Sequence, residues 1–351
     1  MITRSVRIPG FFYVSKGAIE RISEILAIEG VDVSKSLIVS GKSFTKSIGD
    51  KVEDSIDKKS IRVCIEDNEL ESINEVEKAI RNYAPSVLIG VGGGKVLDVT
   101  KYCAYRLNKS FLAVPTVLSN DGISSPVAVI ETGQGLGSLG TTPPIGIIVD
   151  INIIKNSPRE TILAGVGDLI SNTSAVDDWN LASIHAGEKV DKFAQILAKN
   201  SAEGFVQLLL RRPDISSLAI EDESLLVSLA EGLIQSGIAM SLAGSSRPCS
   251  GSEHLISHAL DGLLDYSKPH GLQVGFATLF TTALRRKDIS DLVSLFRRIG
   301  FPATLQELGI PVSTFLEAIK RAPSTRKGRF TILNLASDKE ISAAITTAYG
   351  S

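Results

Sequence analysis

The chain is poor in cysteine, histidine and tryptophan. Its 351 residues include 3 cysteines, 4 histidines and 1 tryptophan. Cys64, Cys103 and Cys249 are widely spaced, so they form neither a CxxC pair nor an even disulfide framework, and we expect a reducing cytoplasm. The formal net charge is only −2, which gives no bulk attraction to nucleic acid or to an anionic membrane. We therefore predict no nucleic-acid partner.

The sequence also lacks a long uninterrupted apolar run. Residues 1–17 contain no continuous apolar core of the kind found in a signal peptide. The most apolar stretch, 224–244, carries Glu231 and Gln235, so we interpret it as a buried core helix and predict no membrane span. With 43% hydrophobic and 22% charged residues, the composition is typical of a globular protein, and the length favours two domains.

The first part of the chain alternates β-rich runs with amphipathic helical segments. This alternation predicts a parallel, doubly wound α/β sheet. A glycine-rich segment, 127–150, reads as a β excursion that returns to the sheet. The expected strands are 36–40, 61–66, 86–91 and 110–116, and the expected helices are 42–56, 69–83 and 95–107.

Helical periodicity dominates after about residue 155. Ser157, Pro158 and Glu160 form an N-cap, a first-turn proline and a capping-box acid, which predicts a helix start. We place a boundary at residue 153, with an α/β nucleotide-binding domain over 1–153 and an all-α domain over 154–351. The active site is expected in the cleft between them.

The sharpest motif of the first domain is "GVGGGKVLDVTK", residues 90–101. It follows a buried strand and opens a helix, so the amides of Gly92, Gly93 and Gly94 can approach a pyrophosphate. It is neither a G-x-G-x-x-G fingerprint, because Lys95 replaces the last glycine, nor a P-loop. The alternative is a tight turn that binds nothing. The next strand ends in "VPTVLSNDGISSP" (114–126), which suits either a ligand site or an Asx-type turn.

Three of the four histidines lie within 17 residues. His254 and His258 are four apart on one helix face, and His270 follows in "KPHG". Two imidazoles and a carboxylate such as Asp168 suit a catalytic divalent metal. Each histidine alone would more often be a hydrogen-bonded core or surface residue, and spacing does not select this set.

The ordered motifs resemble the sn-glycerol-1-phosphate dehydrogenases, members of the superfamily of iron-containing alcohol dehydrogenases, glycerol dehydrogenase and dehydroquinate synthase. The resemblance covers about residues 10 to 285. It implies a dehydroquinate synthase-like fold, a cytoplasmic enzyme and, commonly, a homo-oligomer. The motifs that carry it are "GVGGGKVLDVTK", "VPTVLSNDGISSP", "AGVGDLISNTSAVDDW", "GSSRPCSGSEHLISHALD" and "KPHGLQVG".

The resemblance also implies a set of site residues. Asp168, His254 and His270 match the metal ligands, usually of zinc, with iron as the alternative, and His258 matches a second histidine that shapes the pocket or relays a proton. Asp121 matches a residue near both nicotinamide and substrate. The matches to NAD or NADP contacts are Gly92, Gly93, Gly94, Lys95, Asp98, Thr116, Ser119 and Ser125.

Two departures from the family pattern concern the substrate. Many relatives have H-G-E where this chain has His270-Gly271-Leu272, and a histidine where this chain has Asn120. A phosphorylated substrate needs cations, and Arg247 and Lys268 are the candidates, with an ordinary surface charge as the alternative for each.

The reaction implied by the resemblance is reversible hydride transfer from NAD(P)H to dihydroxyacetone phosphate, which yields sn-glycerol 1-phosphate and serves phospholipid metabolism. The second strand ends in "VSGKS" without an acid, so both NAD and NADP should be used. The alternatives are a dehydrogenase for glycerol or another polyol, a lyase resembling dehydroquinate synthase, and a relative that only binds nucleotide.

Overall fold

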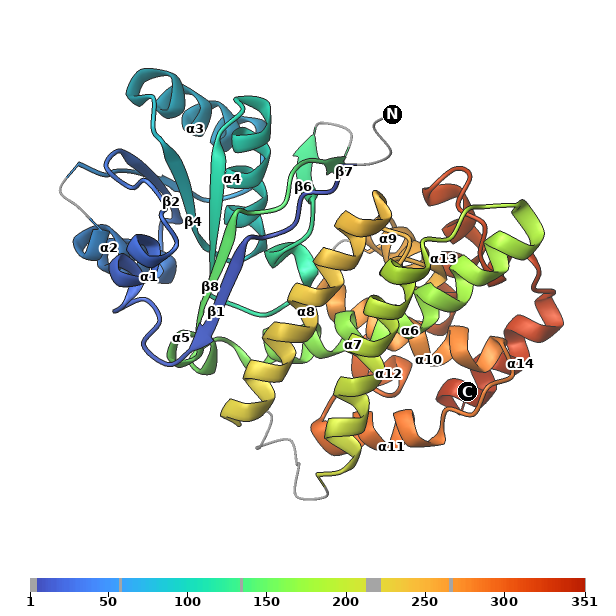
Figure 1. Cartoon of the computed structure of the whole chain (residues 1–351). Coiled ribbons are helices and arrows are strands. Elements are labelled where there is room, and N and C mark those ends of the chain that lie inside the picture. The colour runs from blue at the N-terminus through green and yellow to red at the C-terminus, as the bar shows by residue number, and fades with distance from the viewer. Residues whose placement is uncertain (1–4, 57–58, 133–134, 213–221, 265–267, 351) are drawn as a thin grey trace. The chain divides into compact units, whose positions relative to one another are not determined.

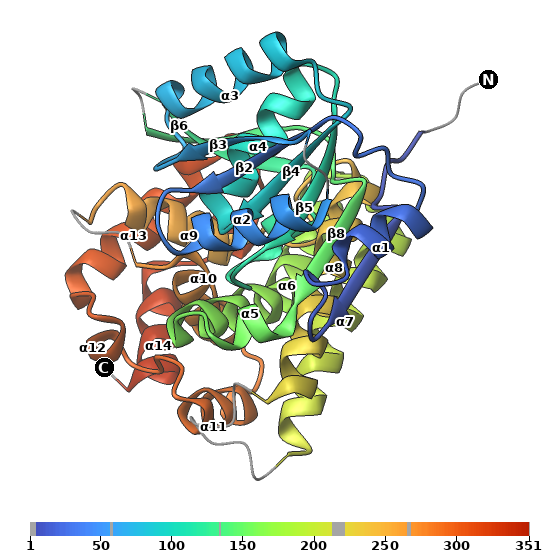
Figure 2. The same cartoon turned by 90° about the vertical axis from the view of Figure 1, so that its left-hand side faces the viewer.

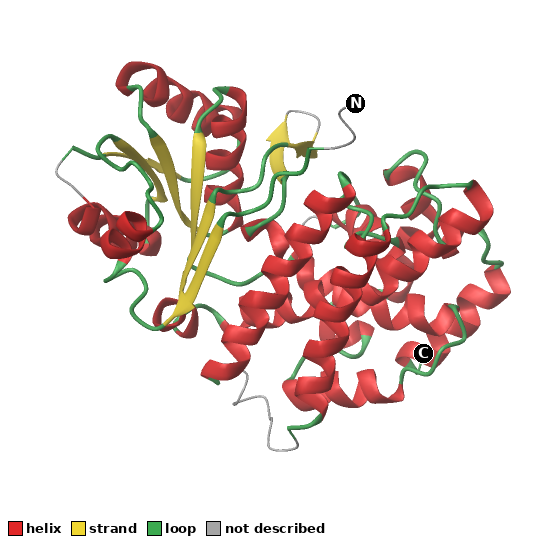
Figure 3. Ribbon diagram, viewed as in Figure 1, coloured by secondary structure: helices red, strands yellow, loops and turns green. Residues whose placement is uncertain are grey.

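The computed structural model describes residues 5–56, 59–132, 135–212, 222–264 and 268–350. The chain divides into two compact units, Met1–Pro158 and Arg159–Ser351 (Figure 1). The predicted boundary, residue 153, falls inside α5(Ile151–Lys155), just before this division. Figure 3 shows the strands gathered in the first unit and helices alone in the described part of the second.

The first unit is built on a six-stranded sheet in the order β1-β8-β5-β4-β2-β3, with every neighbouring pair parallel. The central strands are buried along almost their whole length, as expected for a sheet covered on both faces. The predicted doubly wound fold is therefore confirmed. The strands are β1(Phe11–Ser15), β2(Ser36–Gly41), β3(Ile61–Ile65), β4(Val87–Gly92), β5(Ser110–Pro115) and β8(Gly146–Asp150).

Helices cover both faces of this sheet. The first pair packs together on one face, and α2 crosses in front of the strands in Figure 2. The second pair packs together on the other face. The core under the first pair is made of branched apolar side chains from the helices and from four strands. These helices are α1(Ile22–Ile28) and α2(Phe44–Ile56), then α3(Leu70–Tyr83) and α4(Gly94–Arg106).

Two features of this unit differ from the prediction. The first strand of the sheet, β1, was not expected; it pairs with β8 at the edge. Segment 127–150 returns to the sheet through β8 as expected, but its outer part forms a separate antiparallel pair, β6(Val127–Thr132) and β7(Gly135–Gly140). The tip of that excursion, residues 133–134, lies outside the described residues.

The second unit is helical, as predicted. Its long central helices α6 and α10 pack against each other and are surrounded by the rest. Helix α10 is buried at most positions, so it forms the core of the unit. The helices are α6(Arg159–Ala186), α7(Lys192–Leu210), α8(Glu223–Ala243), α9(Ser252–Asp261), α10(His270–Leu284), α11(Ser290–Ile299), α12(Leu305–Leu308), α13(Val312–Thr325) and α14(Asp338–Tyr349).

Helix α8 is the apolar stretch that the sequence singled out. Among the described residues it is the one helix whose length and hydropathy would suit a membrane span, yet 61% of its most apolar window is buried inside the protein. It packs against α6 and α7. These contacts are those of a core helix.

Candidate functional site

The glycine turn joins β4 to α4. Gly92 ends the strand and Gly94 begins the helix. A Cβ on Gly92 would lie 2.6 Å from the Cβ of Val96, so the turn requires glycine there, whereas a Cβ on Gly94 would meet nothing within 4 Å. The open backbone at Gly94 and the N-terminus of α4 form a surface that a pyrophosphate can approach closely.

This turn lies where the strand order reverses. Strand β2 pairs with both β3 and β4, so the chain moves outward to β3 and then crosses back to β4. Ligands bind at such switch points in doubly wound sheets. Thr116, just past β5, donates its backbone N–H to the carbonyl of Gly92 at 3.0 Å. The structure therefore brings two of the predicted cofactor residues together at the carboxyl edge of the sheet.

The loop after β5 is an Asx-type turn, the alternative that the sequence left open. Asn120 Oδ1 accepts a hydrogen bond from the backbone N–H of Gly122 at 2.9 Å and caps the short helix η1(Asp121–Ile123). The turn stands at the ligand-binding edge, so its presence is compatible with a binding role. The other predicted cofactor residues range from exposed to buried: Lys95 is exposed, Gly93 and Ser119 are half-buried, and Ser125 is buried.

A buried lysine, not singled out from the sequence, holds this loop. The Lys101 side chain is 0% exposed and lies 3.5 Å from Asp98. Its Nζ donates to the carbonyls of Gly122 at 2.8 Å and Val127 at 2.6 Å. A buried ammonium is stable only when paired and hydrogen-bonded. The spacing of Asp98 and Lys101 in an apolar helix was the available signal.

Two carboxyl groups of this unit have raised pKa values. Burial raises the pKa of Asp98 to about 6, against the opposing effect of Lys101. Burial raises the pKa of Asp121 to about 7; Lys101 opposes this shift and Asp98 adds to it. Asp121, predicted to lie near nicotinamide and substrate, is thus able to hold or release a proton near neutral pH.

Asp168, His254 and His270 come together within the helical unit. Asp168 lies in α6, His254 in α9, and His270 is the first residue of α10. Asp168 Oδ1 is 4.0 Å from His254 Nε2 and 3.9 Å from His270 Nε2, and the three ligand atoms lie within 4.8 Å of one another. One carboxylate and two imidazoles directed at one point form a donor set for Zn²⁺ or Fe²⁺.

The outer nitrogens of both imidazoles are held by neighbours. His254 Nδ1 lies 3.0 Å from Glu253 Oε1, and His270 Nδ1 lies 3.0 Å from Ser257 Oγ. Such bonds fix the tautomer and ring orientation of metal-binding histidines. Both Nε2 atoms are thereby left facing Asp168, so the residues present fit a divalent metal ion.

The protonation of the imidazoles also suits a metal. Burial lowers the pKa of His254 well below its usual value, and the neighbouring His258 contributes in the same direction. Burial likewise lowers the pKa of His270, with further contributions from His254 and His258. Neutral imidazole is the form that binds metals, so the site is prepared at neutral pH.

A glycine crossing brings α6 and α10 close enough to form the triad. A Cβ on Gly271 would lie 1.9 Å from the carbonyl oxygen of Ala164, and a Cβ on Gly167 would lie 2.2 Å from the carbonyl oxygen of Gly271. The backbones of the two helices touch here because neither glycine carries a side chain. These glycines adjoin Asp168 and His270 in sequence, so the crossing sets the separation of the two ligands.

His258 lies near the triad, whereas Lys268 directs its Nζ toward Gly309, where a Cβ would lie 3.2 Å from it. The rings of His258 and His270 are stacked with centroids 6.0 Å apart. The carbonyl of Lys268 accepts a hydrogen bond from Gln273 Nε2 at 2.9 Å, and the same Nε2 donates to Asp261 at 2.8 Å. Gln273 thus ties the segment that precedes His270 to the end of α9.

Arg247 is engaged within the protein, which weakens its predicted role as a substrate ligand. Its side chain is 4% exposed, and Glu188 accepts from both Nε, at 2.7 Å, and Nη2. Its Nη1 donates to the carbonyl of Phe330 at 2.9 Å. All three nitrogens are therefore used inside the fold, and Arg247 secures the segment that contains Phe330.

Two arginines that no sequence motif singled out, Arg326 and Arg329, contact the segment before α9. Arg329 donates to the carbonyl of Ser250 and, at 3.1 Å, to Ser246 Oγ, and Arg326 donates to the same Ser246 Oγ at 2.8 Å. Ser250 lies two residues before α9. The only signal in the sequence was the basic run "RKGR" at 326–329.

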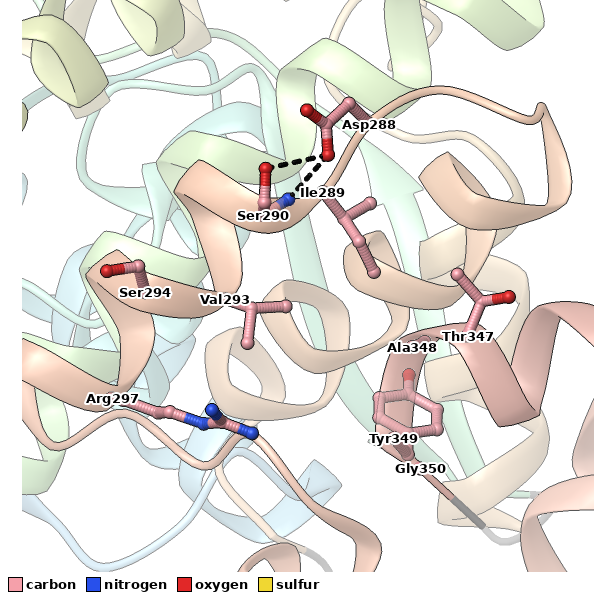
Figure 4. A pocket seen from close by; sticks show the side chains of 10 residues that line it. All are labelled: Asp288, Ile289, Ser290, Val293, Ser294, Arg297, Thr347, Ala348, Tyr349 and Gly350. Atoms are coloured by element: carbon pink, nitrogen blue, oxygen red, sulfur yellow. Dashed lines mark hydrogen bonds between the residues drawn. The ribbon is translucent and has the colours of Figure 1, made fainter.

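A separate pocket of about 580 Å³ lies between α11 and the end of α14 (Figure 4). Val293 and Arg297 line it from one side and Tyr349 from the other. Asp288, at its rim, accepts hydrogen bonds from the backbone and hydroxyl of Ser290 at 2.9 and 2.7 Å. None of the predicted site residues lines this pocket.

Comparison with known sequences finds relatives along nearly the whole chain. A family described as iron-containing alcohol dehydrogenase matches residues 13–158. A protein named glycerol-1-phosphate dehydrogenase [NAD(P)+] from Saccharolobus islandicus (strain L.S.2.15 / Lassen #1) is 37% identical over 331 residues, which cover 93% of this chain and 92% of the relative. A protein of the same name from Pyrococcus abyssi is 40% identical over 307 residues and 86% of each chain.

Comparison with solved structures supports the fold. Glycerol dehydrogenase from Schizosaccharomyces pombe aligns with a TM-score of 0.75 at 22% identity, over 99% of this chain and 90% of that one. At this identity the likeness concerns the fold alone.

Proposed function

The chain belongs to the glycerol-1-phosphate dehydrogenase family, and on that premise we propose that it catalyses the reversible reduction of dihydroxyacetone phosphate to sn-glycerol 1-phosphate with NAD(P)H. The observation that carries the proposal is the convergence of Asp168, His254 and His270 in a chain so extensively similar to these enzymes. A module that only bound nucleotide would gain nothing from that cluster.

The first unit would bind the cofactor. The pyrophosphate would lie against Gly93 and Gly94 at the start of α4, where backbone amides and the helix dipole favour an anion. Lys42 follows β2 and pairs with Glu66 at 3.0 Å in an exposed position. A cation at this strand end suits the 2′-phosphate of NADP, and the acid beside it suits the ribose hydroxyls of NAD, so use of both cofactors is the expectation.

The helical unit would bind the metal and the substrate. Asp168, His254 and His270 would hold one divalent ion, with Zn²⁺ as the first choice and Fe²⁺ as the alternative. The ion would supply Lewis-acid stabilisation of negative charge on the substrate oxygen. Glu253 and Ser257 would keep both imidazoles oriented and in one tautomer.

Proton delivery would fall to His258 and Asp121. Burial lowers the pKa of His258, so its imidazole is neutral at pH 7 and carries one N–H and one acceptor nitrogen. It can therefore relay a proton: the acceptor nitrogen takes one from solvent while the N–H donates one to the C2 oxygen. Asp121, with a pKa of about 7, would be the second group able to exchange a proton in this range. Lys101 would keep the Asp121 loop in place.

The first experiment compares two ketones. Oxidation of NADH and of NADPH is followed with zinc-loaded protein, using dihydroxyacetone phosphate and dihydroxyacetone side by side. A much higher kcat/KM for the phosphorylated ketone is expected. A preference for the free ketone would instead assign the protein to the polyol dehydrogenases, and phosphate release without net oxidation of NADH would indicate the lyase chemistry.

Compartment and assembly are further proposals. Cys64, Cys103 and Cys249 are all free thiols in the structure, which suits a reducing cytoplasm. Self-association is the expectation from the family, and light scattering of the purified protein at several concentrations tests it.

A further inference from the structure

The segment that follows α13 places two guanidinium groups beside the start of α9. Arg326 and Arg329 both donate to Ser246 Oγ, and Arg329 also reaches the carbonyl of Ser250. Two like charges thus share one hydroxyl oxygen. Helix α13 itself packs against α9, so the arginine pair, Arg326 and Arg329, is fixed to the element that carries His254.

A buried carboxylate locks this arrangement. Asp178, 0% exposed, accepts from the backbone N–H and the hydroxyl of Ser252, both at 2.6 Å, through Oδ2. Its Oδ1 accepts from the backbone N–H of Ile332 at 2.7 Å. Arg285 pairs with Oδ1 at 2.5 Å and neutralises the charge. The first residue of α9 and the chain three residues beyond Arg329 are therefore held by one side chain.

Neither arginine of the pair forms an ion pair with a carboxylate among the described residues, although Glu188 and Glu253 act electrostatically on Arg329. The described residues place no carboxylate oxygen within 4.0 Å of a nitrogen of either arginine. Arg247 differs, because both carboxylate oxygens of Glu188 accept hydrogen bonds from its guanidinium. Both groups are half-buried. A guanidinium withdrawn from water without an anion is costly, so the site is prepared for an anionic ligand.

The same charges act on the metal-site histidines. After burial, which is the largest cause, the pKa of His254 is lowered by its neighbour His258 and then by Arg329 and Arg326. Arg326 and Arg329 also contribute to the lowered pKa of His258. Burial and the repulsion between arginines lower the pKa of Arg329 to about 9, which leaves it protonated at pH 7. The geometry agrees: Ser250, whose carbonyl Arg329 contacts, lies four residues before His254, so the pair lies at the end of α9 that carries this histidine.

We propose that Arg326 and Arg329 bind the phosphate group of the substrate. The proposal rests on the function proposed above and names the residues that would distinguish a phosphorylated ketone from a free one. Arg326 uses only Nη1 inside the described part of the chain, so its Nε and Nη2 remain as two parallel donors, the arrangement that recognises phosphate bidentately. Arg247 serves as a positioning residue because it holds the carbonyl of Phe330, next to Arg329.

The test compares variants of this segment with a matched control. Arg326→Gln removes the charge of the less engaged arginine, and Arg329→Lys keeps the charge but loses the planar donor pair. Lys327→Gln makes the same charge change at an exposed residue between them. For each zinc-loaded protein, kcat/KM is measured with NADH for dihydroxyacetone phosphate and for dihydroxyacetone.

The expected result is a selective loss. Removal of one charge-assisted contact should lower the ratio of kcat/KM for phosphorylated over free ketone about 10- to 100-fold in Arg326→Gln, and Lys327→Gln should change it less than about 2-fold. Inorganic phosphate should protect the wild type against thermal unfolding and should lose this effect in Arg326→Gln. Circular dichroism checks folding, and Arg326→Lys replaces a variant that does not fold.

Three outcomes would overturn the proposal. An equal loss with both ketones would leave the arginines a purely structural role. Unchanged phosphate binding in both arginine variants would place the anion elsewhere. A rise in KM for NADPH alone, in a parallel series with that cofactor, would assign the pair to the 2′-phosphate of NADP. A wild type with no preference for the phosphorylated ketone would refute the proposed function itself, whatever the variants do.

Discussion

Replacement of Asp168 by asparagine should separate metal binding from folding. The substitution keeps the shape of a side chain that is 4% exposed and lies 3.9–4.0 Å from both imidazoles, and it removes the one negative ligand. Without metal, the variant should be about as stable as the wild type, because asparagine keeps the side-chain shape and an acceptor oxygen and removes a charge that is costly to bury. The variant should therefore be less stable than the wild type only when metal is added.

The magnitude follows from linkage. Metal at 100 times its Kd stabilises the wild type by about 2.7 kcal/mol. Loss of an outer-sphere partner weakens a metal site roughly 10- to 100-fold, and loss of the ligand itself should cost more, on the order of 1,000-fold. The same metal concentration would then contribute less than about 0.1 kcal/mol. The metal-dependent rise in Tm should fall from about 4 °C, if the chain unfolds as one unit, or about 7 °C, if the helical unit unfolds alone, to nearly zero.

The assay is thermal unfolding of the chelator-treated protein with and without added Zn²⁺. Asp177→Asn is the matched control: it lies on the same helix, its partner is Lys287 at 2.6 Å, and it is 29% exposed. That surface pair should contribute at most about 1 kcal/mol with no response to metal. A full zinc-dependent Tm shift in Asp168→Asn, or its loss in Asp177→Asn, would refute the assigned ligand set.

Three further predictions concern the surroundings of the two sites. Glu253→Gln should weaken Zn²⁺ binding about 10- to 100-fold, because Glu253 orients His254, and competition with a chromophoric chelator measures this; unchanged affinity would remove Glu253 from the site. Gly271→Ala should destabilise the protein by at least about 1–3 kcal/mol in urea, because its Cβ would lie 1.9 Å from the carbonyl oxygen of Ala164, and a neutral result would contradict the close helix crossing. Asp121 has a pKa of about 7 in the folded protein and about 3.9 in the unfolded chain. The stability that its protonation contributes is therefore complete below about pH 4 and is lost as the pH rises to about 7. Asp121→Asn should flatten the free energy of unfolding over this pH range, and an unaltered pH dependence would show that Asp121 does not titrate there.

The elements of the first unit could be read from local patterns with small errors at their ends. Strands buried on both faces are continuous apolar runs, as in β4(Val87–Gly92), and they are hard to mistake between amphipathic helices. The exception is β1(Phe11–Ser15), which alternates between half-buried and exposed positions. An edge strand of this length lacks a strong local pattern, and its pairing with β8 joins residues more than a hundred positions apart.

The residues of the candidate site could be predicted only in part from local sequence patterns. Asp168, His254 and His270 were selected by resemblance, since their spacing alone did not choose among many acidic residues. Lys101 and the arginine pair could not be predicted as site residues, because the partners that define their roles lie far away in sequence. Arg247 was predicted as a phosphate ligand because it lies seven residues before His254 in the sequence. In the fold, its guanidinium forms an ion pair with Glu188.

The amino-acid sequence by itself determined the class of fold, the glycine turn and the residue types of a metal site, because these depend on periodicity, backbone freedom and donor chemistry that local sequence carries. Only the tertiary structure decided which charges are satisfied and which are open to a ligand. No local sequence pattern distinguishes Arg247 from Arg329. In the fold, Arg247 donates to the carboxylate of Glu188, whereas Arg329 donates to a hydroxyl and a carbonyl oxygen. The difference arises because α13 and the segment after it pack against α9. Whether a charged side chain has an oppositely charged partner depends on its neighbours in space, which local sequence does not specify.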